Sequence, residues 1–133
     1  MKHIEIETHT IGPCWPCFVI AEAGVNHNGD RNTALALVDA AKQAGADAVK
    51  FQYYRADTLC SKCSPAYWDT DKEPSKTQYE LFRRHESFGR AEFEMLSRRC
   101  REIGIDFLCT PFDYTAVDDL DDLTAAYKVS SSD

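Results

Sequence analysis

Long hydrophobic runs are missing from this sequence. The purest apolar segment, Phe18 to Ala21, is far too short to span a bilayer, and the opening residues Met1 to Glu5 contain no apolar signal core. These absences predict a cytoplasmic protein with no membrane partner.

Positive charge is also scarce. Lys and Arg number 15 against 22 Asp and Glu, and the formal net charge is -7. Because nucleic-acid binding depends on clustered basic residues, we expect no nucleic-acid partner. A small anionic ligand stays compatible with the composition, since two well-placed lysines can hold a phosphate whatever the overall charge.

Repeats and low-complexity tracts are absent too. Hydrophobic residues make up 44% of the 133 positions and charged residues 28%, which is the composition of a globular domain and not of a disordered or fibrous chain. A chain of this length can bury one hydrophobic core, so we expect one domain or part of one.

A short lead-in precedes the core. Within residues 1–17, the segment His3–Glu7 alternates apolar and polar residues as a half-exposed strand does, and Gly12-Pro13 then breaks the pattern. Phe18–Gly24 follows as a mostly apolar run that ends in glycine. This run is typical of a strand buried on both faces, and we take it as the first core strand.

A helix and a second strand complete the first repeating unit. Asp30 is a suitable N-cap, Gly45 a suitable C-terminal stop, and apolar residues recur between them at helical spacing. The strand Asp47–Tyr53 follows at once. A strand, a helix and a strand joined this closely predict a right-handed crossover with parallel strands.

The same alternation continues to the end of the sequence. A helical stripe that includes Phe93 and Leu96 closes at Gly104, and a strand follows over residues 105–110. Thr115 is the expected cap of the next helix, and Tyr127–Ser130 the expected fourth strand. The sequence therefore predicts an α/β fold with four parallel strands alternating with helices.

A long polar and aromatic segment, Tyr54–Phe88, interrupts this regular pattern. It leaves the end of the second strand and contains Pro65, Pro74 and a short helical stretch, Gln78–Arg84. Loops of this length in compact domains are usually binding elements, and barrels build their active sites at the carboxyl ends of their strands. We expect the segment to border a site.

Hydrophilic residues stand late in each apolar strand, where packing gives no reason for them. In the second strand Lys50 and Gln52 share one face, and Phe51 and Tyr53 share the other. The aromatic face is expected to meet helices. Lys50 would then point into the interior of a barrel, where an ammonium is costly unless an anion neutralises it.

The other strands end in the same way. Together the strand ends supply two cations, two carboxylates and hydroxyl groups, an inventory that suits an anionic substrate and proton transfers: Glu22, Lys50, Gln52, Thr110, Lys128, Ser131 and Asp133. An alternative remains open at this point. The same residues could form a buried Glu–Lys ion pair and other satisfied polar groups at the edge of a sheet.

Four segments carry a resemblance to a known family. Residues 18–29, 44–52, 110–113 and 127–133 together resemble the N-acetylneuraminate, legionaminate and pseudaminate synthases, and the match runs over residues 18–133. The resemblance implies that residues 18–133 are the N-terminal half of a TIM (β/α)8 barrel, truncated after the fourth strand.

The resemblance also implies a reaction. Family members join phosphoenolpyruvate to an open-chain acetamido sugar aldehyde of the N-acetylmannosamine type, giving a nonulosonic acid and phosphate. It further implies that phosphoenolpyruvate is bound by Lys50, Thr110, Lys128 and Ser131. By the same resemblance Glu22 and Gln52 contact the acceptor sugar, and Glu22 and Asp133 are the candidate catalytic residues, with Asp133 helping to activate the attacking water.

Some of what the family needs lies elsewhere. The resemblance implies a divalent metal, manganese or magnesium, held by histidines of later strands, so no metal ligand is assigned to this chain. It also implies a homodimer in which a C-terminal domain completes the partner's site. The 133-residue chain by itself is therefore expected to be inactive. The sequence departs from the family pattern by placing Ser130 and Ser132 around Ser131.

Two other functions stay open. Lys50 or Lys128 could be the nucleophilic amine of a Schiff-base aldolase, or the chain could be a half-barrel remnant without catalytic activity. For the two CxxC pairs, Cys14–Cys17 and Cys60–Cys63, a shared zinc site and a redox role are weighed against unrelated reduced thiols. We favour unrelated thiols, because the pairs fall at opposite ends of a barrel, and we expect Cys100 and Cys109 in the core.

Overall fold

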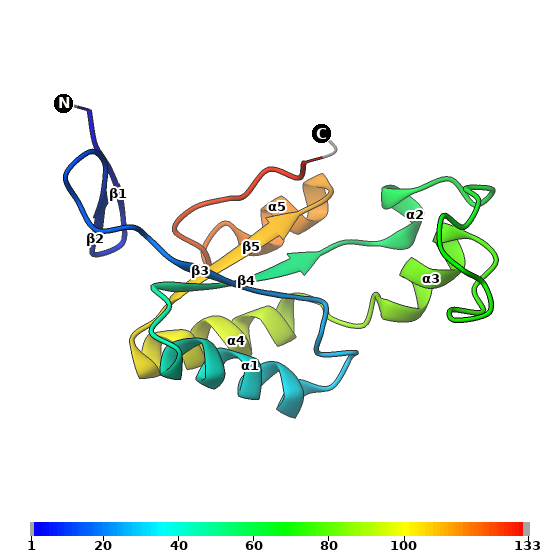
Figure 1. Ribbon diagram of the computed structural model, residues 1–133, viewed down its shortest axis with the longest axis horizontal. Helices are drawn as coiled ribbons and strands as arrows, with labels where there is room; N and C mark the ends of the chain where they lie inside the picture. Colours follow the sequence, from blue (N-terminus) through cyan, green and yellow to red (C-terminus); the bar gives the residue numbers. More distant parts are fainter. Residues whose placement is uncertain (1, 132–133) are drawn as a thin grey trace.

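A computed structural model describes residues 2–131. Its centre is a parallel sheet of three strands in the order β3-β4-β5: β3 (Ile20–Gly24), β4 (Ala48–Tyr53) and β5 (Asp106–Pro111). Figure 1 shows the strands running in one direction through the middle of the molecule. The predicted α/β class and its parallel strand order are confirmed.

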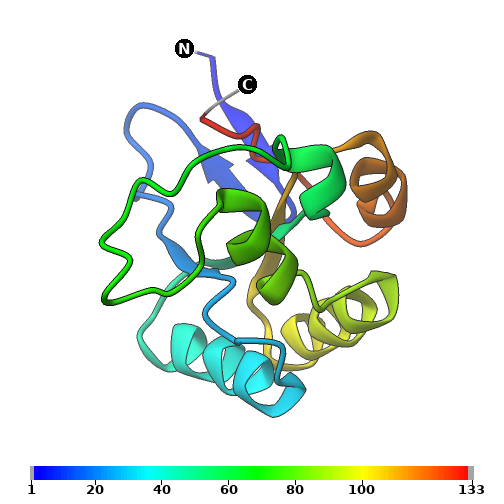
Figure 2. The same ribbon diagram turned by 90° about the vertical axis from the view of Figure 1, so that its right-hand side faces the viewer.

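Three helices cover the sheet on one side. They are α1 (Arg31–Gln43), α4 (Arg90–Ile103) and α5 (Tyr114–Leu120), and Figure 2 shows them arranged in an arc around the sheet. The core lies between the helices and the sheet, where Phe51, Phe93 and Leu96 are fully buried. The aromatic face of β4 therefore meets helices, as its alternation predicts.

The helix ends mostly follow the sequence signals. Asp30 caps α1, its carboxylate accepting a hydrogen bond from the Thr33 N–H at 2.6 Å, and Gly104 ends α4 with a φ of 71°. The cap predicted for α5 is wrong by two residues. Asp113, and not Thr115, is the N-cap, and its Oδ1 accepts from the Ala116 N–H at 2.7 Å. An aspartate carboxylate in the extended cap conformation takes this role as well as a threonine hydroxyl does.

Replacing Asp113 by alanine is expected to destabilise the protein by about 0.5–2 kcal/mol, because the first turn of α5 loses its cap. The same carboxylate also accepts from the Thr58 hydroxyl at 2.6 Å, so the variant removes two contacts. Urea unfolding followed by circular dichroism measures the effect. Asp113→Asn is the matched control, since asparagine caps helices nearly as well as aspartate; equal losses in both variants would contradict the capping role.

The predicted fourth strand is not formed. Over residues 127–130 one residue pair, Tyr127 with Cys109, makes a parallel bridge to β5, and the rest of the segment is irregular. The Thr124 hydroxyl donates to the Phe107 carbonyl at 3.1 Å, which ties the chain to β5 before the predicted strand begins. With Val129 69% exposed, the segment also lacks the packing that a buried strand needs.

The lead-in is a hairpin, in which the strand predicted over His3–Glu7 is confirmed as the first of two strands. The strands β1 (Ile4–Ile6) and β2 (His9–Ile11) pair antiparallel, and β2 was not predicted. His9 Nδ1 lies 3.0 Å from Asp106 Oδ2, which ties the hairpin to the beginning of β5. Figure 1 places the hairpin beyond the amino ends of the core strands.

The long segment after β4 folds back on itself. It contains α2 (Ala56–Leu59), which was not predicted, and α3 (Gln78–His85), which confirms the predicted helical stretch. The Glu86 carboxylate accepts from the Ala56 N–H, so it joins the two ends of the segment. The segment therefore forms a loop with its ends joined, and it lies at the carboxyl ends of the strands (Figure 1).

The cysteines are free thiols. Cys100 and Cys109 are buried, as predicted. The pair Cys14–Cys17 follows the hairpin and the pair Cys60–Cys63 follows α2, so the two pairs lie toward opposite ends of the molecule. Within residues 2–131 no three His, Cys, Asp or Glu side chains are grouped as metal ligands would be. In the same residues no helix is long and apolar enough to cross a membrane.

Candidate active site

A cavity of about 390 Å³ lies where the core strands end. Its lining includes every described residue that the sequence singles out, together with two that it did not: Glu22, Lys50, Gln52, Thr110, Phe112, Lys128, Ser130 and Ser131. The predicted gathering of these side chains at one end of the sheet is therefore observed. Asp133 and Ser132 lie outside the described residues.

Strand register brings the side chains together. Glu22 of β3 stands opposite Lys50 of β4, and Gln52 of β4 stands opposite Thr110 of β5. Parallel neighbours in register place their side chains on the same face of a sheet. Two rows of paired polar residues therefore line one wall of the cavity.

Lys50 is the most deeply placed charged group of the site. Its side chain is 7% exposed, and its Nζ lies 2.7 Å from Oε1 of Glu22, whose side chain is 64% exposed. The alternative of a Glu–Lys ion pair is thus present in the structure. This ion pair leaves Lys50 able to bind another anion, because an ammonium has three N–H donors and a single carboxylate oxygen accepts one.

The cavity lining also contains the second lysine, Lys128. Lys128 Nζ and the Ser131 hydroxyl lie 3.1 Å apart, although no strand holds them. Thr110 is buried at 3% exposure beside them in the cavity lining. With two lysines against one glutamate among its described lining residues, the cavity favours an anion.

Phe112 supplies an apolar wall that sequence reasoning missed. Its ring meets that of Tyr54 edge to face at 6.0 Å, and Tyr54 meets Phe82 of α3 at 5.6 Å. Burial raises the pKa of Tyr54 to about 12. The signal was available, since Phe112 belongs to the Thr-Pro-Phe-Asp segment, but an aromatic residue by itself does not distinguish a site wall from a core.

His27 lies beside the site, in the turn that joins β3 to α1. Its ring stacks on Phe88 with the centroids 3.8 Å apart, and its Nδ1 accepts a hydrogen bond from the Gly29 N–H at 3.1 Å. Gly29 has a φ of 78°, and a Cβ there would lie 2.9 Å from the Ser87 hydroxyl. The turn and residues 87–88 are therefore fitted closely together.

Burial, and after it the nearby His85, lowers the pKa of His27 below its ordinary value of 6.5. Unfolded His27 therefore binds protons at pH values where the folded protein keeps it neutral. The contribution of neutral His27 to the free energy of unfolding is therefore present above the unfolded pKa of about 6.5. This contribution is lost as the pH falls below that value. We expect urea unfolding midpoints to drop more steeply between about pH 7.5 and 5 in wild type than in His27→Phe. Parallel pH dependences in the two proteins would contradict this prediction.

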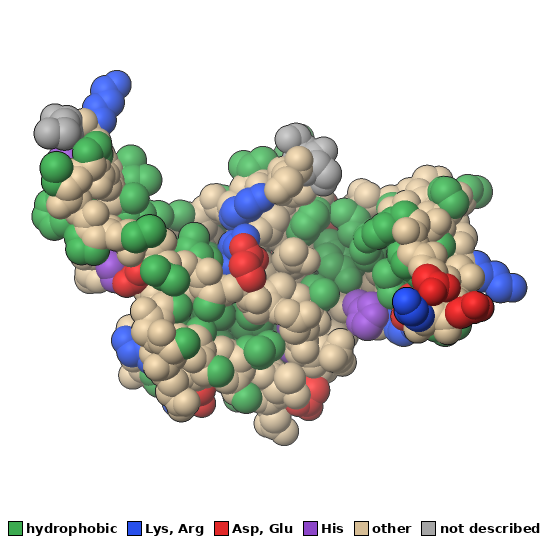
Figure 3. Space-filling model, in the orientation of Figure 1, with side chains coloured by type: hydrophobic (Ala, Val, Ile, Leu, Met, Phe, Trp, Pro, Cys, Tyr) green, Lys and Arg blue, Asp and Glu red, His purple; other side chains and the backbone are tan. Residues whose placement is uncertain are grey.

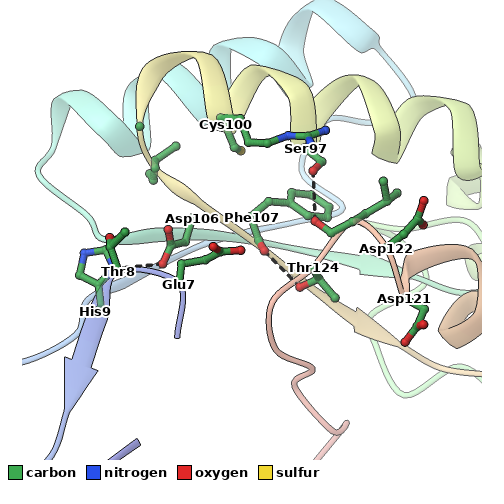
Figure 4. A pocket seen from close by; sticks show the side chains of 14 residues that line it. Glu7, Thr8, His9, Ser97, Cys100, Asp106, Phe107, Asp121, Asp122 and Thr124 are labelled. Carbon is green, nitrogen blue, oxygen red and sulfur yellow. Dashed lines mark hydrogen bonds and ion pairs between the residues drawn. The ribbon is translucent and has the colours of Figure 1, made fainter. Parts of the chain in front are cut away.

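A second hollow lies at the other end of the sheet. Figure 4 shows this cavity of about 360 Å³ between the hairpin, the beginning of β5 and residues 121–124. In the figure His9 reaches Asp106, and the Thr124 hydroxyl reaches Phe107. It lies at the amino ends of the strands, away from the paired polar rows, so we do not assign the chemistry to it.

Comparison with known proteins gives the same picture. The model of the NeuB family matches residues 37–133. The chain belongs to the NeuB family. The N,N'-diacetyllegionaminic acid synthase of Legionella pneumophila is 45% identical over 109 residues, which cover 80% of this chain and 30% of that protein. The NeuB chain spans about a third of the length of the curated relatives it matches.

Solved structures place the NeuB chain in the same fold. The N-acetylneuraminic acid synthetase of Leptospira borgpetersenii, solved in complex with citrate, aligns with a TM-score of 0.83 at 34% identity, over 99% of this chain and 42% of that one. The DAHP synthase of Thermotoga maritima aligns with a TM-score of 0.62 at 11% identity, over 98% of this chain and 31% of that one, which shows the fold alone. The predicted family resemblance is confirmed, and the neighbours are of the TIM-barrel type.

Proposed function

We propose that this chain forms the phosphoenolpyruvate-binding part of a nonulosonic acid synthase. The observation that carries the proposal is the buried Lys50, which lines one cavity with Lys128, Thr110 and Ser131. Phosphoenolpyruvate carries a phosphate and a carboxylate, so two cations and two hydroxyl donors match its charge and its acceptors. The acceptor in the proposal is an open-chain acetamido sugar.

The proposed reaction forms one carbon–carbon bond. C3 of phosphoenolpyruvate attacks the aldehyde carbon of the sugar, water adds at C2, and phosphate leaves. Lys50 and Lys128 hold the anionic groups, and the Thr110 and Ser131 hydroxyls donate hydrogen bonds to them. In this proposal Glu22 and Gln52 face the sugar, and Asp133, outside the described residues, helps to activate the water.

A divalent metal would polarise the aldehyde oxygen in such a reaction. The described residues do not fit a metal site, because no three His, Cys, Asp or Glu side chains are grouped among residues 2–131. We therefore assign no metal ligand to this chain and route no step through the metal. Its ligands, the remaining sugar contacts and the dimer partner belong to the proposed whole protein.

A direct test measures ligand binding to the 133-residue chain. Isothermal titration is expected to show that phosphoenolpyruvate binds more tightly than inorganic phosphate or pyruvate, because it alone engages both lysines. Equal affinities for phosphate and phosphoenolpyruvate would contradict the proposal and show that the cavity binds anions without selectivity. A chimaera that joins residues 18–131 to the remainder of the Legionella synthase then tests turnover with manganese and candidate amino sugars.

The same preparation tests the Schiff-base alternative. Schiff-base chemistry needs a neutral amine, whereas Lys50 is paired with a carboxylate at 2.7 Å. Borohydride added with pyruvate or sugar is expected to leave the mass of the chimaera unchanged. A covalent adduct on Lys50 or Lys128 would favour the aldolase and overturn the proposal.

A further inference from the structure

His27 is a polar ring in an apolar position. It is 2% exposed, stacked on Phe88, and lies 6.2 Å from the ring of Phe51. A phenylalanine would fill the same space. The imidazole nitrogens must therefore account for a histidine here, and one of them is already explained, since Nδ1 accepts the hydrogen bond from Gly29 that closes the turn.

That hydrogen bond fixes the tautomer. Because the Gly29 N–H donates to Nδ1, Nδ1 carries no proton, and the neutral ring bears its hydrogen on Nε2. Nε2 is buried and has no hydrogen-bond partner within residues 2–131. A buried donor without an acceptor is costly, so an acceptor other than a described protein atom is expected.

A small cavity adjoins the ring. It measures about 10 Å³, close to the space that one water molecule needs, and its lining includes His27, Gln52, His85 and Glu86, whose side chain is 7% exposed. Gln52 also lines the candidate active site. The Gln52 amide makes no hydrogen bond of its own within the described residues, and Gln52 and His27 both line this cavity.

We propose that this cavity binds one structural water that orients Gln52. The water accepts the hydrogen bond from His27 Nε2–H and donates to the Gln52 carbonyl oxygen and to the Glu86 carboxylate. With its oxygen held, Gln52 presents its NH₂ group as a pair of donors to the active-site cavity. His27 is thus a positioning residue, and the importance of this for an acceptor sugar rests on the proposed function.

Nuclear magnetic resonance of the 133-residue chain, kept monomeric by Ile20→Lys at the edge of β3, tests the water and the amide without any ligand. With His27 in place we expect its Nε2–H signal to show a cross-peak to a long-lived water. The Gln52 side-chain NH₂ is expected to be as rigid as ordered backbone, with an order parameter of about 0.85. The side chain of Gln43, exposed at the end of α1, is expected to fall below about 0.6. A Gln52 amide as mobile as Gln43, or no water cross-peak, overturns the proposal.

A variant separates the role of His27 from general packing. His27→Phe keeps an aromatic ring beside Phe88 and removes Nε2, so the Gln52 order parameter is expected to fall to the Gln43 level. Gln78, whose amide donates to the Pro65 carbonyl at 3.0 Å, is the internal control and is expected to stay unchanged. A Gln52 amide that stays rigid in His27→Phe contradicts the proposal. If the variant fails to fold, the wild-type water cross-peak and order parameters decide.

The test of the water site and the test of phosphoenolpyruvate binding can fail separately. If phosphoenolpyruvate does not bind but Gln52 is rigid and the water is present, the proposed function fails and the water site stands. If phosphoenolpyruvate binds but Gln52 is mobile, the water site fails and the proposed function stands.

Discussion

Lys50→Ala is expected to weaken phosphoenolpyruvate binding by roughly 10- to 150-fold and to remove most of the turnover of the chimaera. The Lys50 side chain is 7% exposed, so water cannot substitute well for its lost charge. A hydrogen bond between charged groups is worth about 1.5–3 kcal/mol, which sets the lower and upper limits of the expected change. Isothermal titration measures the affinity, and steady-state kinetics measure the requirement for phosphoenolpyruvate.

Two further variants make the result specific. Lys128→Ala is expected to weaken binding in the same direction but less, because Lys128 lies in an exposed contact with Ser131 where water can replace it. Lys72→Ala removes a lysine whose side chain is 85% exposed in the long segment after β4 and is expected to bind like wild type. If Lys50→Ala keeps wild-type affinity, the assignment of the phosphate-binding residues is wrong.

The site was largely predictable because strand geometry is local. Alternation along β4 places Lys50 and Gln52 on one face, and parallel register places Glu22 and Thr110 beside them. Both follow from the period of two residues in a strand and from the βα pattern. The family resemblance added the roles, which stay predictions until ligand binding is measured.

What the sequence did not reveal depends on contacts between distant segments. The second strand of the hairpin pairs within a segment of mixed composition, and its attachment is a His9–Asp106 contact across 97 residues. The fourth strand is absent over residues 127–130, where the pairing with β5 is limited to the Tyr127–Cys109 bridge and Val129 is 69% exposed. Likewise, the orphaned Nε2 of His27 emerges only where Phe88 and Gly29 meet around it.

The 133-residue chain produced by itself is expected to self-associate at micromolar concentration and to show no synthase turnover. Within the described residues β3 pairs on one side with β4 and has no strand on its other side. Open strand edges pair readily with other chains. Val19 and Ile20 at this edge are 51% and 39% exposed, and Figure 3 shows further hydrophobic side chains on the surface of the hairpin and the central part.

A charge at the edge tests the mechanism of association. Ile20→Lys is expected to shift the chain toward a monomer in size-exclusion chromatography with light scattering, because a charged side chain opposes pairing along β3. Tyr67→Lys, at a residue 75% exposed in the long segment, adds the same charge elsewhere and is expected to leave the elution unchanged. Turnover is expected from none of these proteins, since the described residues include no metal-ligand group. A monodisperse wild-type monomer would contradict association through the edge of β3. Consumption of phosphoenolpyruvate with N-acetylmannosamine by that monomer would contradict the assignment of essential groups to the rest of a barrel.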